Sequence, residues 1–231
     1  QLPSLSSDFK GSYSKLMQSL WTYFKSESSV RLAAVRGGLG FAGFSAFWTT
    51  LVFLMEDNFN YGSGITGLFG ILGIAGALAA TWAGKLSDKM NKNRLITIAT
   101  LVMILAWGVF EFSGESIVGL VIGVVFIDMG LQSLHITNQN IIFSKNPEAR
   151  NRINTIYMVG YFIGGALGTT TGAYAWQWFQ WEGVASLGLI YTILILLVHL
   201  IFKQKNTIFV SNIFLTLHLR KYSNADISYL K

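Results

Sequence analysis

The stretch "GKLSDKMNKNR", residues 84–94, carries five charged side chains and lies between two long apolar segments. Four of the charges are cations, and the one acid is Asp88. A helix that crosses the hydrocarbon core of a bilayer needs about 20 predominantly apolar residues, and both flanking segments are about that long. The stretch is therefore typical of a short basic connection between two membrane helices.

The composition also indicates a membrane protein. Hydrophobic residues make up 52% of the 231 residues, charged residues make up 12%, and the mean hydropathy is +0.48. Too little polar surface remains to cover a water-soluble globule of this size. We therefore expect an all-α integral membrane protein in the lipid bilayer, and we assign its net charge of +6 to membrane topology rather than to nucleic acid.

The residue types exclude several kinds of site. The sequence has no cysteine, which removes disulfides, thiol catalysis and cysteine-bound metals. Its three histidines lack the spacing of a zinc site, and it has no phosphate-binding loop. The two prolines, Pro3 and Pro147, are too few for the repeats of mitochondrial-type carriers, and the stretch "GFSAF" (residues 43–47) lacks the second glycine of an intramembrane serine protease. We expect no metal, no cofactor and no enzymatic activity.

Six apolar segments are long enough to span a bilayer. They cover residues 33–55, 64–83, 95–112, 117–142, 153–176 and 184–202.

The charges of the connections sort to opposite sides of these spans. All 17 lysines and arginines lie at the start of the first span or before it, between the second and third, between the fourth and fifth, or after the sixth. The other connections carry only acids, namely Glu56, Asp57, Glu111, Glu115 and Glu182. The positive-inside rule then predicts a cytoplasmic basic face with both termini inside.

Two flanking regions complete the predicted domain organisation. Apolar residues at helical spacing between Lys10 and Lys25 predict an amphipathic helix in the cytoplasmic interface. We assign residues 1–32 to a cytoplasmic linker with this helix, residues 33–202 to the six-span bundle and residues 203–231 to a cytoplasmic tail.

The quoted stretch resembles the loop motif of the major facilitator superfamily, which is glycine-x-leucine-x-aspartate followed by cations. The matching residues are Gly84, Leu86, Asp88 and a basic cluster that ends at Arg94. An ordinary basic connection would explain the lysines but not the other three residues. The resemblance implies a gating loop in which Asp88 faces a helix N-terminus or an arginine.

A second stretch, "NPEARNRINTIYMVGYFIGGALGTTTGAY" (residues 146–174), is similar to the loop and fifth helix of one six-helix half of that superfamily. Members have two such halves and twelve spans. The fifth span lacks the proline that many antiporter members carry in the corresponding helix of their N-terminal half. The resemblance therefore implies a C-terminal half whose partner is a missing N-terminal six-helix half, with Arg150 and Arg152 in the gating loop.

The stretches "GFSAFWTTLVFL" (residues 43–54) and "HITNQN" (residues 135–140) look like those of bacterial sugar or drug exporters of the superfamily. This resemblance implies a secondary active transporter of the bacterial inner membrane, which moves a small solute outward by alternating access, as an antiporter driven by protons. The alternative is a truncated six-span bundle without transport activity, which persists as a remnant or as a partner-binding subunit.

Four polar residues share one face of the fourth span, because they are spaced by four, three and four positions: Asp128, Gln132, His135 and Gln139. Asp128 lies roughly 16 Å along the helix from Ile117, where a charge costs at least ~2.5–3.5 kcal/mol. The resemblance places the first and fourth helices along a central cavity, which implies that this stripe contacts solute or protons. The alternatives are that Asp128 pairs with a neighbouring helix or lies where water reaches it, and that His135 only hydrogen-bonds within the bundle.

Polar and aromatic residues of two other spans are further candidates for the cavity wall. They are Ser45, Trp48 and Thr49 in the first span and Tyr157 and Tyr161 in the fifth. Trp48 lies far from either interface, where it could stack on a ligand, fill the bundle or face lipid.

Glycines form two ridges that predict close helix contact, either static or between moving parts. One contains Gly160, Gly164, Gly168 and Gly172, and the other Gly67, Gly70, Gly73 and Gly76.

Overall fold

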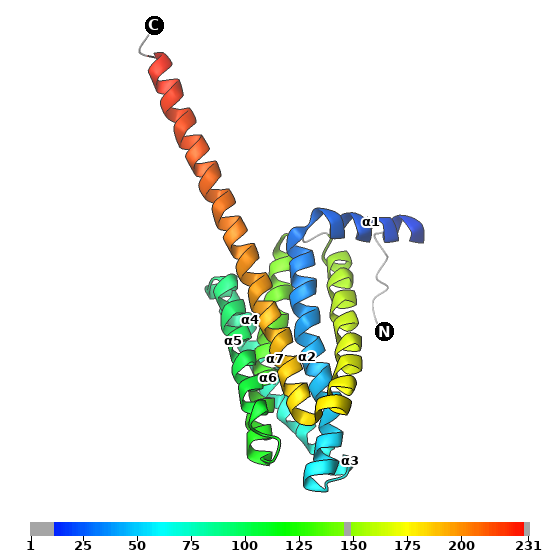
Figure 1. Ribbon diagram of the computed structural model, residues 1–231. Helices are drawn as coiled ribbons and strands as arrows, with labels where there is room; N and C mark the ends of the chain where they lie inside the picture. Colours follow the sequence, from blue (N-terminus) through cyan, green and yellow to red (C-terminus); the bar gives the residue numbers. More distant parts are fainter. Residues whose placement is uncertain (1–11, 146–148, 229–231) are drawn as a thin grey trace.

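A computed structural model of the protein describes residues 12–145 and 149–228, and the regular structure of these residues is helical. The long helices run side by side, and the first helix lies across one end of the bundle (Figure 1). The prediction of an all-α protein is confirmed. The elements are α1 (Tyr13–Ser26), α2 (Ser28–Phe59), α3 (Ser63–Leu68), the 3₁₀ helix η1 (Phe69–Leu72), α4 (Gly73–Lys89), α5 (Lys92–Glu111), α6 (Ile117–Lys145) and α7 (Arg150–Ser228).

Among the described residues, five helical stretches are long and apolar enough to cross a membrane, which supports a multi-pass membrane protein. Each of the six predicted segments overlaps one of them, and two, residues 153–176 and 184–202, share the last. The stretches are Ser28–Phe59, Ser63–Lys89, Lys92–Glu111, Ile117–Ser144 and Arg150–Phe202.

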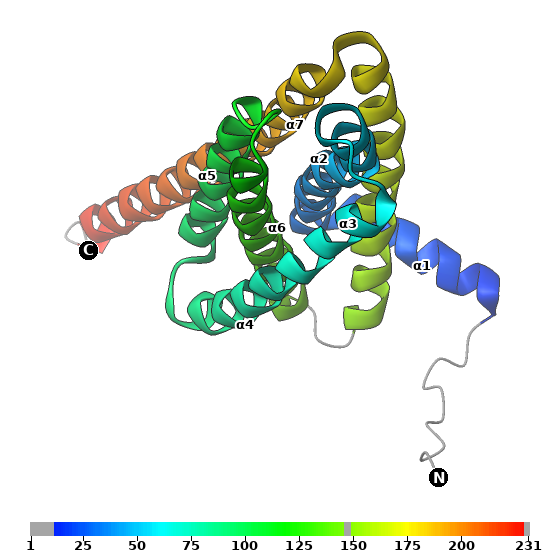
Figure 2. The same ribbon diagram turned by 90° about the horizontal axis from the view of Figure 1, so that it is seen from below.

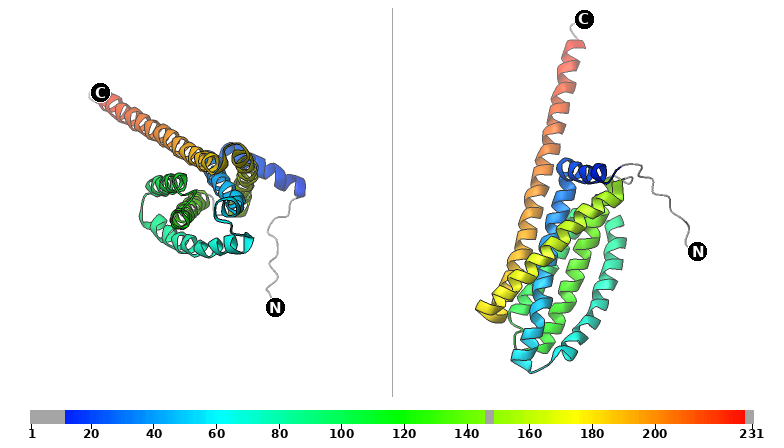
Figure 3. Two further views of the ribbon diagram at one scale, coloured as in Figure 1. Left: turned by 60° about the horizontal axis from the view of Figure 1, so that its bottom comes forward. Right: turned by 90° about the vertical axis from the view of Figure 1, so that its right-hand side faces the viewer.

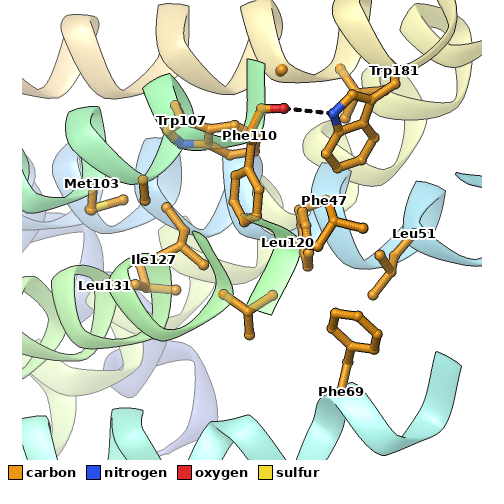
Figure 4. Close-up of a cluster of buried hydrophobic side chains, with 14 of the residues drawn as sticks. Phe47, Leu51, Phe69, Met103, Trp107, Phe110, Leu120, Ile127, Leu131 and Trp181 are labelled. Atoms are coloured by element: carbon orange, nitrogen blue, oxygen red, sulfur yellow. Dashed lines mark hydrogen bonds between the residues drawn. The ribbon is translucent and has the colours of Figure 1, made fainter. Parts of the chain in front are cut away.

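Helix α7 is bent back on itself at Gln180, whose φ of 51° and ψ of −145° are not helical. The parts before and after Gln180, called here the first and second segments of α7, form a V (Figures 1 and 3). Such a backbone costs on the order of 1–3 kcal/mol and needs support from its surroundings. The Trp181 indole Nε1 provides it by donating a 2.7 Å hydrogen bond to the backbone oxygen of Phe110, at the end of α5 (Figure 4).

The same corner holds the aromatic centre of the core. Phe47 of α2 stacks on Phe110 with ring centroids 4.6 Å apart, and Trp107 meets Phe110 edge-on at 5.3 Å. Together with Trp181 these side chains are buried, and they join α2, α5 and the second segment of α7 (Figure 4).

The second apolar stretch is not one regular helix. It consists of α3, η1 and α4, because glycines at positions 64, 67, 70 and 73 weaken the helix at its start. At its other end α4 continues through Gly84 to Lys89, beyond the predicted end at residue 83. Lysine and leucine are good helix formers, so one glycine does not end the helix there. Only Met90 and Asn91 therefore lie between α4 and α5.

The glycine ridge of α7 packs directly on the backbone of α2. A Cβ atom on Gly164 would lie 2.0 Å from the carbonyl oxygen of Gly38, and one on Gly168 would lie 2.0 Å from that of Ala42. These distances leave no room for a side chain, so the ridge sets the approach of the two helices. In the other predicted ridge, Cβ atoms on Gly67, Gly70 and Gly73 would meet no described residue within 4 Å, whereas one on Gly76 would lie 3.1 Å from Asp128 of α6.

The two ends of the bundle carry different connections. Helix α1, the α4–α5 connection and the start of α7 lie at one end, whereas α3, the α5–α6 connection and the turn of α7 lie at the other (Figures 1 and 3). The first end therefore holds the basic connections of the sequence and the second holds the acidic ones.

Replacing Gly168 by alanine should destabilise the bundle, because its Cβ would press against the backbone of Ala42. We expect the free energy of unfolding in detergent to fall by about 1–3 kcal/mol. The matched control is Gly108→Ala in α5, where a Cβ would meet nothing within 4 Å. Equal stability of the two variants would contradict the close contact.

Candidate functional site

The polar stripe of α6 faces two neighbouring helices. Its first two members pack against α4, because a Cβ atom on Gly76 would lie 3.1 Å from the Asp128 Cβ and 3.2 Å from the Gln132 Cγ. Its last two contact the first segment of α7. There Tyr157 meets His135, and the Gln139 Nε2 donates a 3.4 Å hydrogen bond to the Oδ1 of Asn154.

His135 lies among tyrosines of α7. Its Nδ1 is 3.0 Å from the hydroxyl oxygen of Tyr157, and its ring centroid is 4.9 Å from that of Tyr161. Tyr157 is fully buried, so the hydroxyl has a protein partner where water is scarce. The structure thus brings together three residues that the sequence placed on two different spans.

Helix α2 closes this group from the opposite side. Phe41 stacks on Tyr161 with centroids 4.2 Å apart and an angle of 14° between the rings. The hydroxyl of Tyr157 lies against Gly37, where a Cβ would come within 2.7 Å of the oxygen. A side chain at position 37 would therefore displace Tyr157 from His135.

The candidates on α2 occupy a different part of the same wall. The hydroxyl of Thr49 hydrogen-bonds that of Thr169 at 3.2 Å, and Ser45 packs near Gly165, so both contact the first segment of α7. Trp48 is half-buried against Phe44 and Phe47, and its indole nitrogen has no hydrogen-bond partner among the described residues. Within the described part of the chain, these residues make no hydrogen bond and no ring contact with the α6 stripe.

Asp128 is the most unusual group of the stripe. Its side chain is only 4% exposed, and its Oδ2 has no hydrogen-bond partner among the described side chains of residues 12–144 and 149–202. An ionised carboxylate in such a place loses its hydration without compensation, whereas a neutral acid loses far less. Proton uptake or the arrival of a cation at Asp128 would remove this cost.

Arg36 and His199 are among the buried polar residues that were not predicted as site residues. Arg36, grouped in the sequence with the basic residues at the start of the first span, lies eight positions inside α2, which begins at Ser28. It is 1% exposed, and its Nη1 is 3.0 Å from the Nδ1 of His199. The distance of Arg36 from the start of the helix could have indicated that its side chain is buried. The position of a helix end, however, cannot be read closely from a sequence.

The predicted gating loop is partly assembled. Asp88 and Arg150 line one pocket of about 330 Å³, together with Lys92, whose Nζ donates a 3.1 Å hydrogen bond to the Asn140 carbonyl oxygen. The guanidinium of Arg150 lies 4.6 Å from the ring centroid of Phe143 at the same place.

The remaining members of the predicted loop lie elsewhere. The guanidinium of Arg152 lies 5.5 Å from the ring centroid of Tyr23 in α1, and Arg94 is exposed. Gly84 is in ordinary contact with α6, since its Cβ would lie 3.9 Å from Ile136.

Comparison with known proteins identifies relatives of this bundle. Residues 10–209 match the Major Facilitator Superfamily. The chain is 40% identical over 188 residues to the "Uncharacterized transporter YgaY" of Escherichia coli, which covers 81% of this chain and 48% of that protein. It is 29% identical over 157 residues to the "Probable transporter SCO4007" of Streptomyces coelicolor, covering 67% of this chain and 36% of that protein. The chain spans about half the length of the Escherichia coli relative and a smaller share of the Streptomyces coelicolor relative.

Replacing Tyr157 by phenylalanine should lower the stability of the bundle without changing the shape of the site. The ring stays, but His135 loses the partner of its Nδ1 in a buried place, so we expect a loss of about 1–3 kcal/mol in the free energy of unfolding. Tyr174→Phe on the same helix is the control, because Tyr174 is 53% exposed. If both variants unfold alike, the His135–Tyr157 contact contributes nothing.

Proposed function

Because the chain belongs to the Major Facilitator Superfamily, we propose that it forms half of a secondary transporter that moves a small solute across a membrane by alternating access. Its relatives are named transporters, and the family is one of transport proteins rather than enzymes. The observation that carries the proposal is the buried carboxyl of Asp128, whose Oδ2 has no hydrogen-bond partner among the described side chains, on a stripe that reaches His135.

We propose that the bundle has six spans and pairs with an N-terminal six-helix half. Each arm of the bent α7 includes an apolar stretch near the length that a bilayer requires. The coverage of about half of the Escherichia coli relative supports a missing half. Helix α4 also supports a missing half, because it has exposed apolar side chains that are available to a partner or to lipid, namely Ile74, Leu78 and Trp82.

The orientation follows from charge. The end of the bundle with α1 carries the basic connections, so we propose that it faces the cytoplasm of a bacterium and that the protein lies in the inner membrane. In this arrangement residues 1–32 are a linker whose helix α1, which has no buried residue, lies in the interface. Residues 33–202 are the half-bundle, and residues 203–231 are a cytoplasmic tail.

Topology reporters inserted after Asn91, Tyr61 and Gln180 test the six-span arrangement. We expect the first to read cytoplasmic and the other two external, since Tyr61 and Gln180 lie at the opposite end of the bundle from the α4–α5 connection. A cytoplasmic signal at Gln180 would contradict two separate spans within α7.

The proposed cycle couples the solute to protons at Asp128. Protonation makes the buried carboxyl neutral, and deprotonation restores an uncompensated charge that favours a conformation with water or a cation beside it. Gln132, His135 and Gln139 offer hydrogen-bonding groups along the same face, with Tyr157 and Tyr161 beside them. We propose that these residues, with Ser45, Trp48 and Thr49, line the path of solute and proton. The predicted gating residues would then control its cytoplasmic end, namely Gly84, Asp88, Arg94, Arg150 and Arg152.

Replacing Asp128 by asparagine in the complete transporter should abolish proton-driven accumulation or efflux, because the amide cannot exchange a proton. Passive exchange of solute should remain in part, since the side chain keeps its size and polarity. The assay compares the solute gradient with and without a proton gradient in vesicles, with Asp57→Asn as control because Asp57 is exposed.

A gradient in the Asp128→Asn variant as steep as that of the unchanged protein would show that Asp128 has no coupling role. Absence of solute exchange from every version, with normal membrane insertion, would favour the alternative of a bundle that no longer transports.

A further inference from the structure

The bend of α7 leaves a hollow between its two segments. Its volume is about 710 Å³, which is within the range of about 300–1,000 Å³ that is usual for small-molecule sites. Small and apolar side chains line it, among them Ala175 of the first segment and Ser186 and Leu187 of the second. The hollow is therefore a candidate binding site on the surface of the bundle.

The hollow extends from the turn of α7 to the depth of about one leaflet. Its lining reaches Thr171 on the first segment and Ile190 on the second, which are nine and ten residues from Gln180. At 1.5 Å per residue this is roughly 15 Å, or half of a hydrocarbon core of about 30 Å. The hydroxyl oxygens of Thr171 and Tyr191 lie 2.8 Å apart and join the two segments at that depth. The length of the hollow thus suits an acyl chain of a single leaflet.

A second hollow, with a volume of about 640 Å³, adjoins the first at the turn. Glu111, Phe179 and Glu182 line both hollows, so these residues lie at the boundary between the two. The second hollow is more polar, since Asn58 and Glu115 also line it. An apolar hollow that opens into a polar one suits an amphiphile, with its tail in the first and its head group in the second.

The charges at this boundary indicate the sign of the head group. Glu111 and Glu182 are both acids, and the connections at this end of the bundle contain no lysine or arginine in the sequence. The cations of the chain lie toward the opposite end, across the membrane from these two residues. A cation that contacts Glu111 and Glu182 must therefore belong to another molecule.

Aromatic side chains at the turn favour the same kind of head group. Tyr174 and Trp178 line the apolar hollow, are exposed, and have ring centroids 5.7 Å apart. Tyrosine and tryptophan are typical of the level of the lipid head groups, and the faces of their rings attract ammonium groups. Both the acids and the rings thus favour a positively charged group at this level.

We propose that the two hollows, called here the α7 groove, bind one phospholipid whose head group ends in a primary ammonium. The lipid comes from the leaflet at the acidic end of the bundle. Its acyl chain lies between the segments of α7, and its ammonium donates hydrogen bonds to the carboxylates of Glu111 and Glu182. A phospholipid with a net negative charge and no ammonium has the same tails but is repelled by these carboxylates. The proposal does not rest on transport or on Asp128, because no residue of the α6 stripe lines the groove.

Lipids brominated near the end of their acyl chains test this proposal, because bromine quenches a nearby fluorophore. The sequence has no cysteine, so one cysteine can carry the fluorophore. Leu194→Cys is suitable, since Leu194 is exposed one helical turn beyond Ile190 at the inner end of the groove. Ile98→Cys, on the exposed face of α5, is the control position.

The 231-residue chain is placed in nanodiscs of equal parts phosphatidylethanolamine and phosphatidylglycerol, with bromine on one lipid or on the other. At Leu194 we expect phosphatidylethanolamine to bind about fivefold more tightly, which is the scale that two exposed charge contacts provide. At Ile98 we expect no preference. Equal binding of the two lipids at Leu194 would overturn the proposal. A preference that is lost in the complete transporter would also overturn it, because the other half would then cover the groove.

The decisive variant is Glu111→Gln with Glu182→Gln, which removes both charges and keeps the size of the side chains. We expect the preference for phosphatidylethanolamine at Leu194 to disappear. The matched control is Glu56→Gln with Asp57→Asn, which removes the same charge from exposed residues at the same end that do not line the groove. A preference that survives in the first variant, or is lost in the second, would contradict the assignment to Glu111 and Glu182.

A further variant tests the space between the segments. Ser186→Phe should fill the apolar hollow and abolish the preference although both acids remain, and it should still fold because Ser186 is exposed. Ala173→Phe is the control, since Ala173 is exposed on the first segment and lines neither hollow. An unchanged preference in Ser186→Phe would show that no acyl chain lies between the segments and would overturn the proposal.

Discussion

The contact between α2 and the first segment of α7 is the constraint on which the rest of the bundle depends. Gly164 and Gly168 lie directly on the α2 backbone, at distances that no larger residue allows. This approach brings the hydroxyl of Tyr157 against Gly37 and within reach of His135. In lipid the association of helices relies on such packing and on hydrogen bonds, because lipid chains are as apolar as the side chains. The packing of small residues thus sets the geometry of the polar site.

Polar groups inside the bundle fall into two classes that differ in their partners. His135 and Tyr157 satisfy each other, and the Nη1 of Arg36 contacts His199, although the Nε of Arg36 has no partner in the described part of the chain. Asp128, in contrast, has an oxygen without a partner in the described part of the chain. Satisfied groups stabilise one arrangement, whereas an unsatisfied acid favours whichever arrangement supplies a partner. A protein that must change shape needs both classes.

Much of this fold could be predicted, because apolar length, charge sorting and glycine spacing are local properties of sequence. The α6 stripe and the α7 ridge were recognised from helical periodicity alone. The helical character of residues 84–89 was missed, since basic residues suggest a connection although they also form good helices. Of the predicted ridge in the second apolar stretch, Gly76 alone contacts another described helix, and Gly67, Gly70 and Gly73 do not. The Arg36–His199 pair was not predicted, because a contact between residues 163 positions apart leaves no local pattern.

Because of the turn at Gln180, the second segment of α7 can tilt as a rigid arm about its end at the turn. Trp181 fixes one end of this arm to α5, and His199 lies roughly 28 Å along it at 1.5 Å per residue. A tilt of about 5° about the fixed end would displace the far end by roughly 2 Å over that length, which is several times the range of about 0.5 Å over which hydrogen-bond lengths vary. A small angular change at one side of the membrane is thus magnified at the other, with no bending of the helix itself.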